Sequence, residues 1–289
     1  EVVPDSGCGS WLWESQSTNL IPYSEDFSQW SKSNASLINT ITSTVVSPNG
    51  VSYANKLYPI GAGSNAYIRQ TIAGDCFSIF VKKGERKWIL IYGGFANSNV
   101  WFDSENGVLG TVKSEATATV ESFGNDWYRI KILWTQNSTQ VRIYNVDSDN
   151  SLVSTGNGTD GLYIWGAQLE QQSYATSYIP TNGEANGVTR NQDLCNNGGS
   201  LASINSTEGV LYVEIAALSD DLTNRVVSIN DGTTNNRVSI VIGTASNQIR
   251  GQVLSSGTSF DFSTTSYNTL NNNKIAISYK LNDFSMWIN

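Results

Sequence analysis

WYRIKILW, the sequence from Trp127 to Trp134, alternates between two kinds of side chain. One set, at positions 128, 130, 132 and 134, is aromatic or aliphatic, whereas the other set includes Arg129 and Lys131. Successive side chains of a β-strand point to opposite faces. The pattern therefore predicts a half-buried strand, with the arginine and the lysine on its wetter side.

The same two-residue period recurs along most of the chain. It predicts further strands at residues 88–92, 162–169, 209–216, 225–229, 237–242, 248–254 and 274–281. Gly-, Asn- and Asp-rich segments separate these strands and are typical of turns. The best helical candidate, residues 208–221, has a β-rich first half. We therefore expect an all-β protein built from sandwiches or barrels.

Composition narrows the classes of partner. The chain has 289 residues, of which 39% are hydrophobic, and this length favours two domains. The net charge of −8 argues against nucleic acid and anionic membranes, since phosphate binding requires a basic surface. No stretch of eighteen apolar residues exists to insert into a membrane, and residues 1–10 do not read as a secretory signal.

Periodicity lapses after residue 181, where Pro, Gly and Asn cluster as in a linker. We expect a first domain at 17–181, a linker at 182–199 and a second domain at 200–289. Residues 1–16 are interpreted as the end of an upstream element. The second domain stops inside an expected strand, so we interpret it as incomplete.

Motifs throughout the first domain resemble a family of jelly-roll domains from bacteriophage tail fibres and head fibres. They are STNLIPYSEDFSQW (17–30), FVKKGER (80–86), WFD (101–103), GVLGT (107–111), WYR (127–129), LYIWGAQLE (162–170) and TSYIPT (176–181). More remotely, the start of this domain resembles xylan- and glucan-binding carbohydrate-binding modules. The second domain, through STEGVLYVEI (206–215) and DFSMWIN (283–289), resembles laminin-G/concanavalin-like sandwiches.

The resemblance implies two tandem β-sandwich domains, jelly-roll and concanavalin/lectin-like, on the surface of a virion. The implied function is reversible recognition of host-surface polysaccharide by a homo-oligomer that also contacts other virion proteins. Three scattered cysteines without a C-x-x-C pair suit assembly in the reducing cytoplasm of a bacterial host. The alternatives are a purely structural spacer or assembly joint, part of a polysaccharide depolymerase, and a bacterial surface adhesin.

The sequence gives little indication of a catalytic site, and we expect no enzymatic activity in this segment. The sequence contains no histidine, which excludes Ser-His-Asp and Cys-His nucleophilic systems. Glycoside hydrolysis needs only two carboxylates. However, Glu214 is not followed by the Glu-x-Asp-x-x-Glu spacing of concanavalin-like glucanases, so no catalytic residue is assigned.

Sugar binding requires aromatic faces together with a few polar groups that orient the ring. The preferred cluster is Trp127, Arg129 and Lys131, on the wetter face of one strand, with Trp101 and Tyr92 as second choices. For each tryptophan, burial in the core is the competing interpretation. Three tryptophans are assigned to the core outright: Trp30, Trp134 and Trp165.

A metal site is a weaker hypothesis, and no cofactor is required. The acidic spacing from Asp147 is not an EF-hand, since Leu152 and Gly158 occupy the positions of its glycine and glutamate. The resemblance to carbohydrate-binding modules implies a structural calcium ion instead, held by Glu25 or Asp26 near Glu170.

Overall fold

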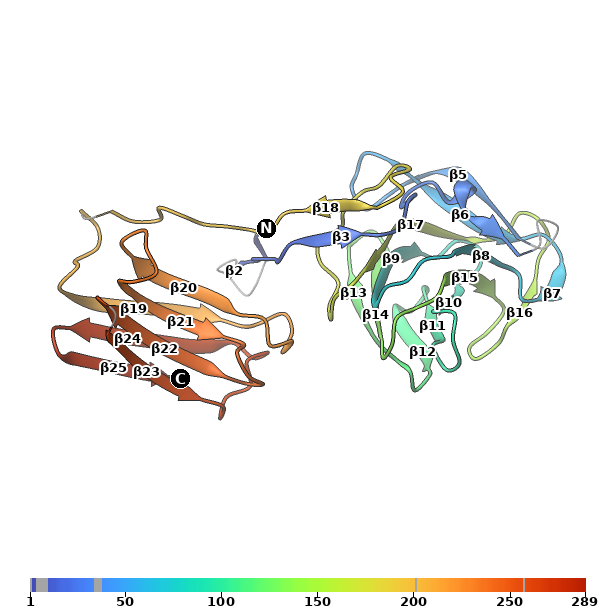
Figure 1. Cartoon of the computed structure of the whole chain (residues 1–289). Coiled ribbons are helices and arrows are strands. Elements are labelled where there is room, and N and C mark those ends of the chain that lie inside the picture. The colour runs from blue at the N-terminus through green and yellow to red at the C-terminus, as the bar shows by residue number, and fades with distance from the viewer. Residues whose placement is uncertain (1, 4–9, 34–37, 201, 257) are drawn as a thin grey trace. The chain divides into compact units, whose positions relative to one another are not determined.

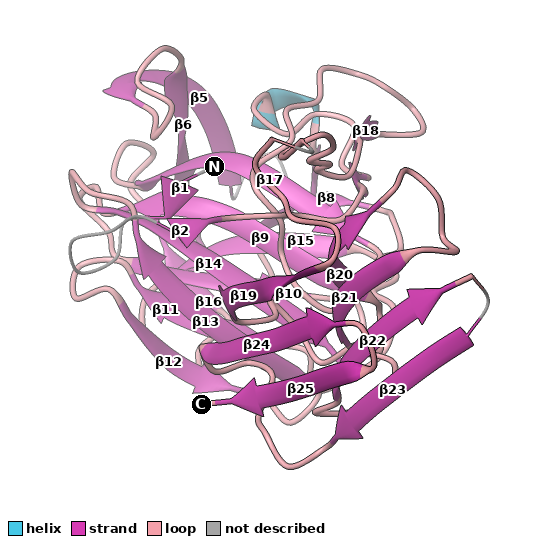
Figure 2. Ribbon diagram, turned by 90° about the vertical axis from the view of Figure 1, so that its left-hand side faces the viewer, coloured by secondary structure: helices cyan, strands magenta, loops and turns pink. Residues whose placement is uncertain are grey.

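The computed structural model describes all residues except 1, 4–9, 34–37, 201 and 257. Strands and loops make up nearly all of the ribbon in Figure 2, with one short 3-10 helix, η1 (Phe27–Gln29). The chain divides into two compact units, residues 1–194 and 195–289. The protein is therefore all-β, as the alternation predicted.

Two six-stranded sheets form most of the first unit (Figure 1). The β10 sheet has the order β12 (Val108–Val112), β11 (Val100–Asp103), β10 (Trp88–Tyr92), β15 (Val141–Val146), β8 (Tyr67–Gln70) and β4 (Ser31–Lys32). The β14 sheet has the order β13 (Ala116–Ser122), β14 (Trp127–Trp134), β9 (Cys76–Lys82), β17 (Leu162–Glu170), β6 (Tyr53–Pro59) and β5 (Ile38–Val46). Neighbouring strands run antiparallel in both sheets.

The two sheets share one hydrophobic core, an arrangement consistent with a β-sandwich. Alternate residues of each strand enter it: Ile89 and Ile91 from β10, and Ile130 and Ile132 from β14. Each of these four side chains has no exposed surface, and burial of one isoleucine contributes about 1.5–3 kcal/mol. Because both inner faces point into this core, the outer faces of the sheets lie on opposite sides of the unit.

The core assignments of three tryptophans are confirmed. Trp30 and Trp134 pack in the shared core, and Trp165 is buried in a smaller cluster with Trp127 and Phe80.

Among the cysteines, Cys76 is buried and free, whereas Cys195 is free and exposed. Cys8 lies outside the described residues.

Short strand pairs extend the first unit into the segment expected to be a linker. β18 (Val188–Arg190) pairs with β3 (Ser17–Asn19), and residues 14 and 193 are joined by hydrogen bonds. The expected linker at 182–199 is thus partly structured, because the backbone of β3 offers a pairing edge to it. The other short pairs are β1 (Val2–Val3) with β2 (Ser10–Trp11), and β16 (Val153–Thr155) with β7 (Ala62–Ser64).

The second unit contains two smaller antiparallel sheets around its own core. One has the order β19 (Glu208–Ile215), β24 (Asn273–Lys280) and β25 (Asp283–Ile288). The other has the order β20 (Arg225–Asn230), β21 (Arg237–Ile242), β22 (Ile249–Ser255) and β23 (Thr258–Thr264). Among the described residues there is no helix with the length and apolar character that crossing a bilayer requires.

Candidate functional site

The preferred cluster lies on the outer face of the β14 sheet, and most of it is covered. Trp127 is 2% exposed and donates its indole N–H to the carbonyl of Val46. Arg129 is 4% exposed and donates to the Ser78 hydroxyl at 2.9 Å and the Thr176 carbonyl at 2.7 Å. The expectation of a wet face is therefore wrong at Trp127 and Arg129.

Lys131 differs from its two neighbours because it stays half-exposed. Its ammonium pairs with Glu121 on β13 at 2.7 Å.

Burial lowers the pKa of Arg129 from its ordinary value, although the charge of Glu170 opposes this effect. The guanidinium of Arg129 lies 5.3 Å from the centre of the Phe80 ring and serves as a packing group.

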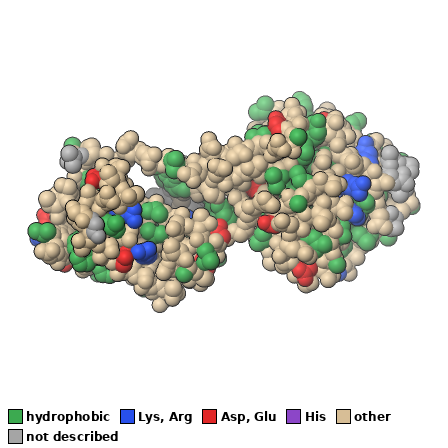
Figure 3. Space-filling model, in the orientation of Figure 1, with side chains coloured by type: hydrophobic (Ala, Val, Ile, Leu, Met, Phe, Trp, Pro, Cys, Tyr) green, Lys and Arg blue, Asp and Glu red, His purple; other side chains and the backbone are tan. Residues whose placement is uncertain are grey.

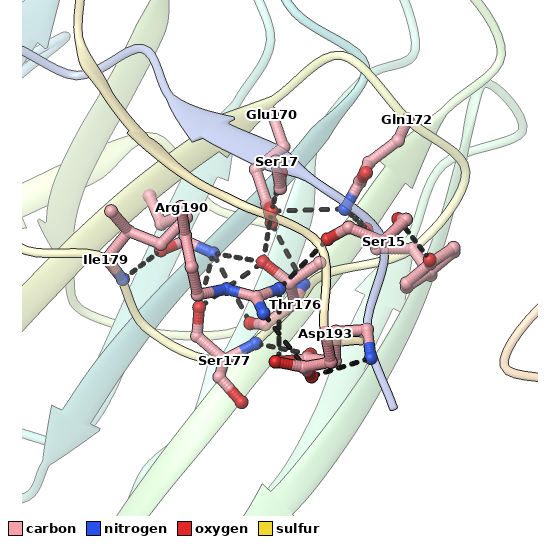
Figure 4. A network of polar contacts seen from close by, with 12 residues as sticks. Ser15, Ser17, Glu170, Gln172, Thr176, Ser177, Ile179, Arg190 and Asp193 are labelled. Carbon is pink, nitrogen blue, oxygen red and sulfur yellow. Dashed lines mark hydrogen bonds and ion pairs between the residues drawn. The ribbon is translucent and has the colours of Figure 1, made fainter. Parts of the chain in front are cut away.

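A network of polar contacts holds the covering segment, residues 171–181, on the β14 sheet (Figure 4). At its centre the fully buried Glu170 carboxylate accepts four hydrogen bonds, from Ser17, Gln172 and, twice, Thr176. We call Glu170, Ser17, Gln172 and Thr176 the Glu170 network. A buried carboxylate remains stable only when donors satisfy its oxygens. Because this network holds the covering segment over the outer face, alternation alone wrongly predicted that Arg129 is exposed to solvent.

The residues expected to hold calcium form hydrogen bonds with different partners. Glu25 accepts a hydrogen bond from the Tyr178 hydroxyl at 3.1 Å, and Asp26 caps η1 by accepting from the backbone of Ser28. Within the described part of the chain, no three His, Cys, Asp or Glu side chains are grouped to share a metal ion. The structure therefore does not unite Glu25, Asp26 and Glu170 in one donor set.

The second-choice residues, Trp101 and Tyr92, share the outer face of the β10 sheet. Across the strands, Trp101 of β11 is opposite Leu90, Leu90 is opposite Tyr144, and Tyr144 is opposite Tyr67. A parallel row joins Tyr92, Arg142 and Arg69. We call the outward side chains of β8, β10, β11 and β15 the aromatic face: Tyr67, Arg69, Trp88, Leu90, Tyr92, Trp101, Asp103, Arg142, Tyr144 and Val146.

Exposure divides the aromatic face into supporting and accessible side chains. Trp101 and Tyr144 are each 2% exposed, and the Trp101 indole N–H donates to the carbonyl of Ser151 at 2.8 Å. These two rings therefore support the surface from beneath. Tyr67, Trp88 and Tyr92 are only half-buried, so each keeps part of its side chain exposed to solvent.

Arg142 lies between two of the accessible rings. Its guanidinium carbon is 4.5 Å from the centre of the Tyr67 ring and 4.9 Å from that of Tyr92. A guanidinium over an aromatic face is stabilised by the negative charge density of the ring. Sequence reasoning missed Arg142, Tyr144 and Tyr67, although the alternation within VRIYNV (141–146) and YIRQ (67–70) could have placed them on one face.

A shallow pocket of about 430 Å³ adjoins the aromatic face at Trp88. We call it the Trp88 pocket, and its lining consists of Lys83, Glu85, Arg86, Lys87, Trp88, Glu105, Val146, Asp147 and Thr155. Lys83 pairs with Glu105, Arg86 with Asp147, and Lys87 with Glu105 at 2.9 Å. One wall of the pocket is thus aromatic, and the positive and negative side chains of its lining largely balance each other.

Two carboxylates at the Trp88 pocket are held in their charged form. Partial burial raises the pKa of Asp147, but hydrogen bonds from Thr155 and Arg86 outweigh burial and bring it below the ordinary value. Hydrogen bonds from Lys83 and Lys87 lower the pKa of Glu105. Fixed carboxylates and ammonium groups beside an aromatic ring are suited to binding hydroxyl groups of a sugar.

Comparison of the sequence with protein-family models and with curated proteins found no match.

Proposed function

We propose that the chain binds host-surface glycans reversibly through the aromatic face and the Trp88 pocket of its first unit. The observation that carries this proposal is the grouping of three half-buried rings, Tyr67, Trp88 and Tyr92, on one outer sheet face beside a polar pocket. Aromatic rings pack against the apolar C–H faces of pyranose sugars, while polar groups fix their orientation.

The setting of this activity is, in our proposal, a bacteriophage appendage that exposes several copies of the chain on the virion. The motif resemblance of the first domain supports this setting, and the antiparallel sheets of both units are consistent with it. On the face of the molecule in Figure 3, charged side chains are few and scattered, in keeping with a charged fraction of 15%. Such a surface favours weak contacts with polysaccharide over strong electrostatic attraction.

Weak binding at each site is compatible with this role. A shallow site of this kind binds with a Kd near 1 mM, or about −4 kcal/mol. Several copies on one particle raise the effective affinity by a factor of roughly 10²–10⁴, since later contacts form within one assembly.

An assembly joint is the second candidate function, and one feature of the second unit favours it. Tyr212 and Trp287 are each 56% exposed and lie opposite Ala276 on the same face of the three-stranded sheet. Exposed apolar residues gathered on one face are typical of protein interfaces.

A glycan array probed with the full chain, displayed in many copies on beads, tests the proposal. We expect retention on a restricted set of polysaccharides and on cells that display them. If beads that carry folded protein retain no glycan, that result would contradict glycan recognition and favour the assembly joint.

A further inference from the structure

The two arginines of the aromatic face differ from the cations of the Trp88 pocket. Lys83, Arg86 and Lys87 each pair with a carboxylate. By contrast, Arg142 and Arg69 form no ion pair with any residue that the structure describes. Two positive charges thus stand side by side on β15 and β8 without a compensating carboxylate.

Register places these two arginines as direct neighbours. Arg142 of β15 is the cross-strand partner of Arg69 of β8, on the same face. Like charges directly opposite one another in a sheet are destabilising. Their juxtaposition therefore costs stability unless an anion binds between them.

The guanidinium of Arg142 is held in one orientation. The Tyr67 and Tyr92 rings lie 4.5 and 4.9 Å from its central carbon, and one terminal nitrogen is 3.5 Å from the Tyr144 hydroxyl. Its Nε is buried and has no hydrogen-bond partner among the described residues. An arginine whose planar group is already ordered loses little freedom when it forms paired hydrogen bonds with an oxyanion.

We propose that Arg142 and Arg69 form an anion subsite within the aromatic face that binds the carboxylate of an acidic sugar, such as a uronic acid. This inference rests on the proposed glycan recognition and names the class of glycan. The rings of Tyr67 and Tyr92 pack against the sugar, while the two guanidinium groups bind its carboxylate. A neutral glycan leaves both arginines unpaired, so the subsite discriminates between acidic and neutral chains.

The net charge of −8 does not prevent this recognition. At physiological ionic strength, charges further apart than about 8 Å are largely screened. An acidic chain at the aromatic face therefore interacts chiefly with Arg142 and Arg69. The overall negative charge instead disfavours its binding elsewhere on the protein.

The test compares two oligosaccharides of equal length on the full chain: oligogalacturonate and its carboxyl-reduced, neutral counterpart. We expect oligogalacturonate to bind at least tenfold more tightly. Arg142→Gln should lose that preference, and Arg142→Lys should restore only part of it, since a lysine keeps the charge but not the planar fork. The matched control is Lys274→Gln in the second unit, which removes a charge that pairs with no carboxylate of a described residue, and it should bind as the parent does.

The outcomes distinguish failure of the anion subsite from failure of glycan recognition. Equal binding of both oligosaccharides, unchanged by Arg142→Gln, would overturn the anion subsite and leave glycan recognition standing. Equal loss of oligogalacturonate binding in Lys274→Gln and Arg142→Gln would also overturn the subsite, because general charge would then explain the preference. A sulfated oligosaccharide that binds more tightly than oligogalacturonate would overturn the carboxylate assignment. No binding of any glycan would defeat both proposals.

Discussion

Glu170 and Thr176 are joined by two hydrogen bonds. The backbone N–H of Thr176 donates to one carboxylate oxygen at 3.1 Å, and its hydroxyl donates to the other at 2.5 Å. Glu170 ends β17, and Thr176 lies in the segment that covers the β14 sheet. This pair therefore connects the sheet to the segment that hides Arg129.

Replacement of the Glu170 carboxylate by an amide should destabilise the first unit. Glu170→Gln keeps the shape but turns one acceptor oxygen into a donor that faces other donors. We expect the free energy of unfolding to fall by about 1–3 kcal/mol, as measured by urea denaturation. The control is Glu121→Gln, at the half-exposed partner of Lys131, for which we expect a change below about 1 kcal/mol. Equal stability of the two variants would show that the Glu170 network contributes little.

The Arg86–Asp147 pair predicts a pH dependence of stability. The folded pKa of Asp147 lies below its ordinary value of 3.8, so the folded state favours the charged carboxylate. Its contribution is fully present above that ordinary value and disappears as the pH falls through the folded pKa. Wild type should therefore exceed Asp147→Asn in urea midpoint at pH 6, and the difference should be smaller at about pH 3, below the ordinary pKa of 3.8. A difference that is the same at both pH values would contradict this assignment.

Two glycines with similar backbone angles should respond differently to substitution. Gly107 and Gly124 have φ of 67° and 75°, so alanine is strained at both, by roughly 1–2 kcal/mol. A Cβ at Gly107 would lie 2.3 Å from the Tyr128 ring, whereas a Cβ at Gly124 meets nothing within 4 Å. Gly107→Ala should therefore lose about 1–3 kcal/mol more than Gly124→Ala in thermal or urea unfolding. Equal losses would show that the ring moves aside freely.

Sequence alternation was sufficient for several of the strands and for the inward face of β14. The expected strands at 88–92, 127–134 and 237–242 coincide with β10, β14 and β21. It also identified the inward residues of β14, because hydrophobic periodicity is a local property of the chain.

Exposure of the outward faces could not be predicted in the same way. Arg129 is hidden by a carbonyl 47 residues away, and Trp127 donates to one 81 residues away. Both contacts depend on strand order and on the path of the covering segment, which no local pattern specifies. The contact of Arg142 with Tyr67 likewise depends on the pairing of β15 with β8.

The central claim is that accessible rings of the aromatic face bind glycan, and equilibrium binding to the best immobilised polysaccharide tests it most directly. Trp88→Ala and Tyr92→Ala should each weaken binding at least tenfold, or about 1.4 kcal/mol. Tyr53→Ala, which removes a 55% exposed ring from β6 in the opposite sheet, should bind as the parent does. Parent-like binding by folded Trp88→Ala and Tyr92→Ala would contradict the claim.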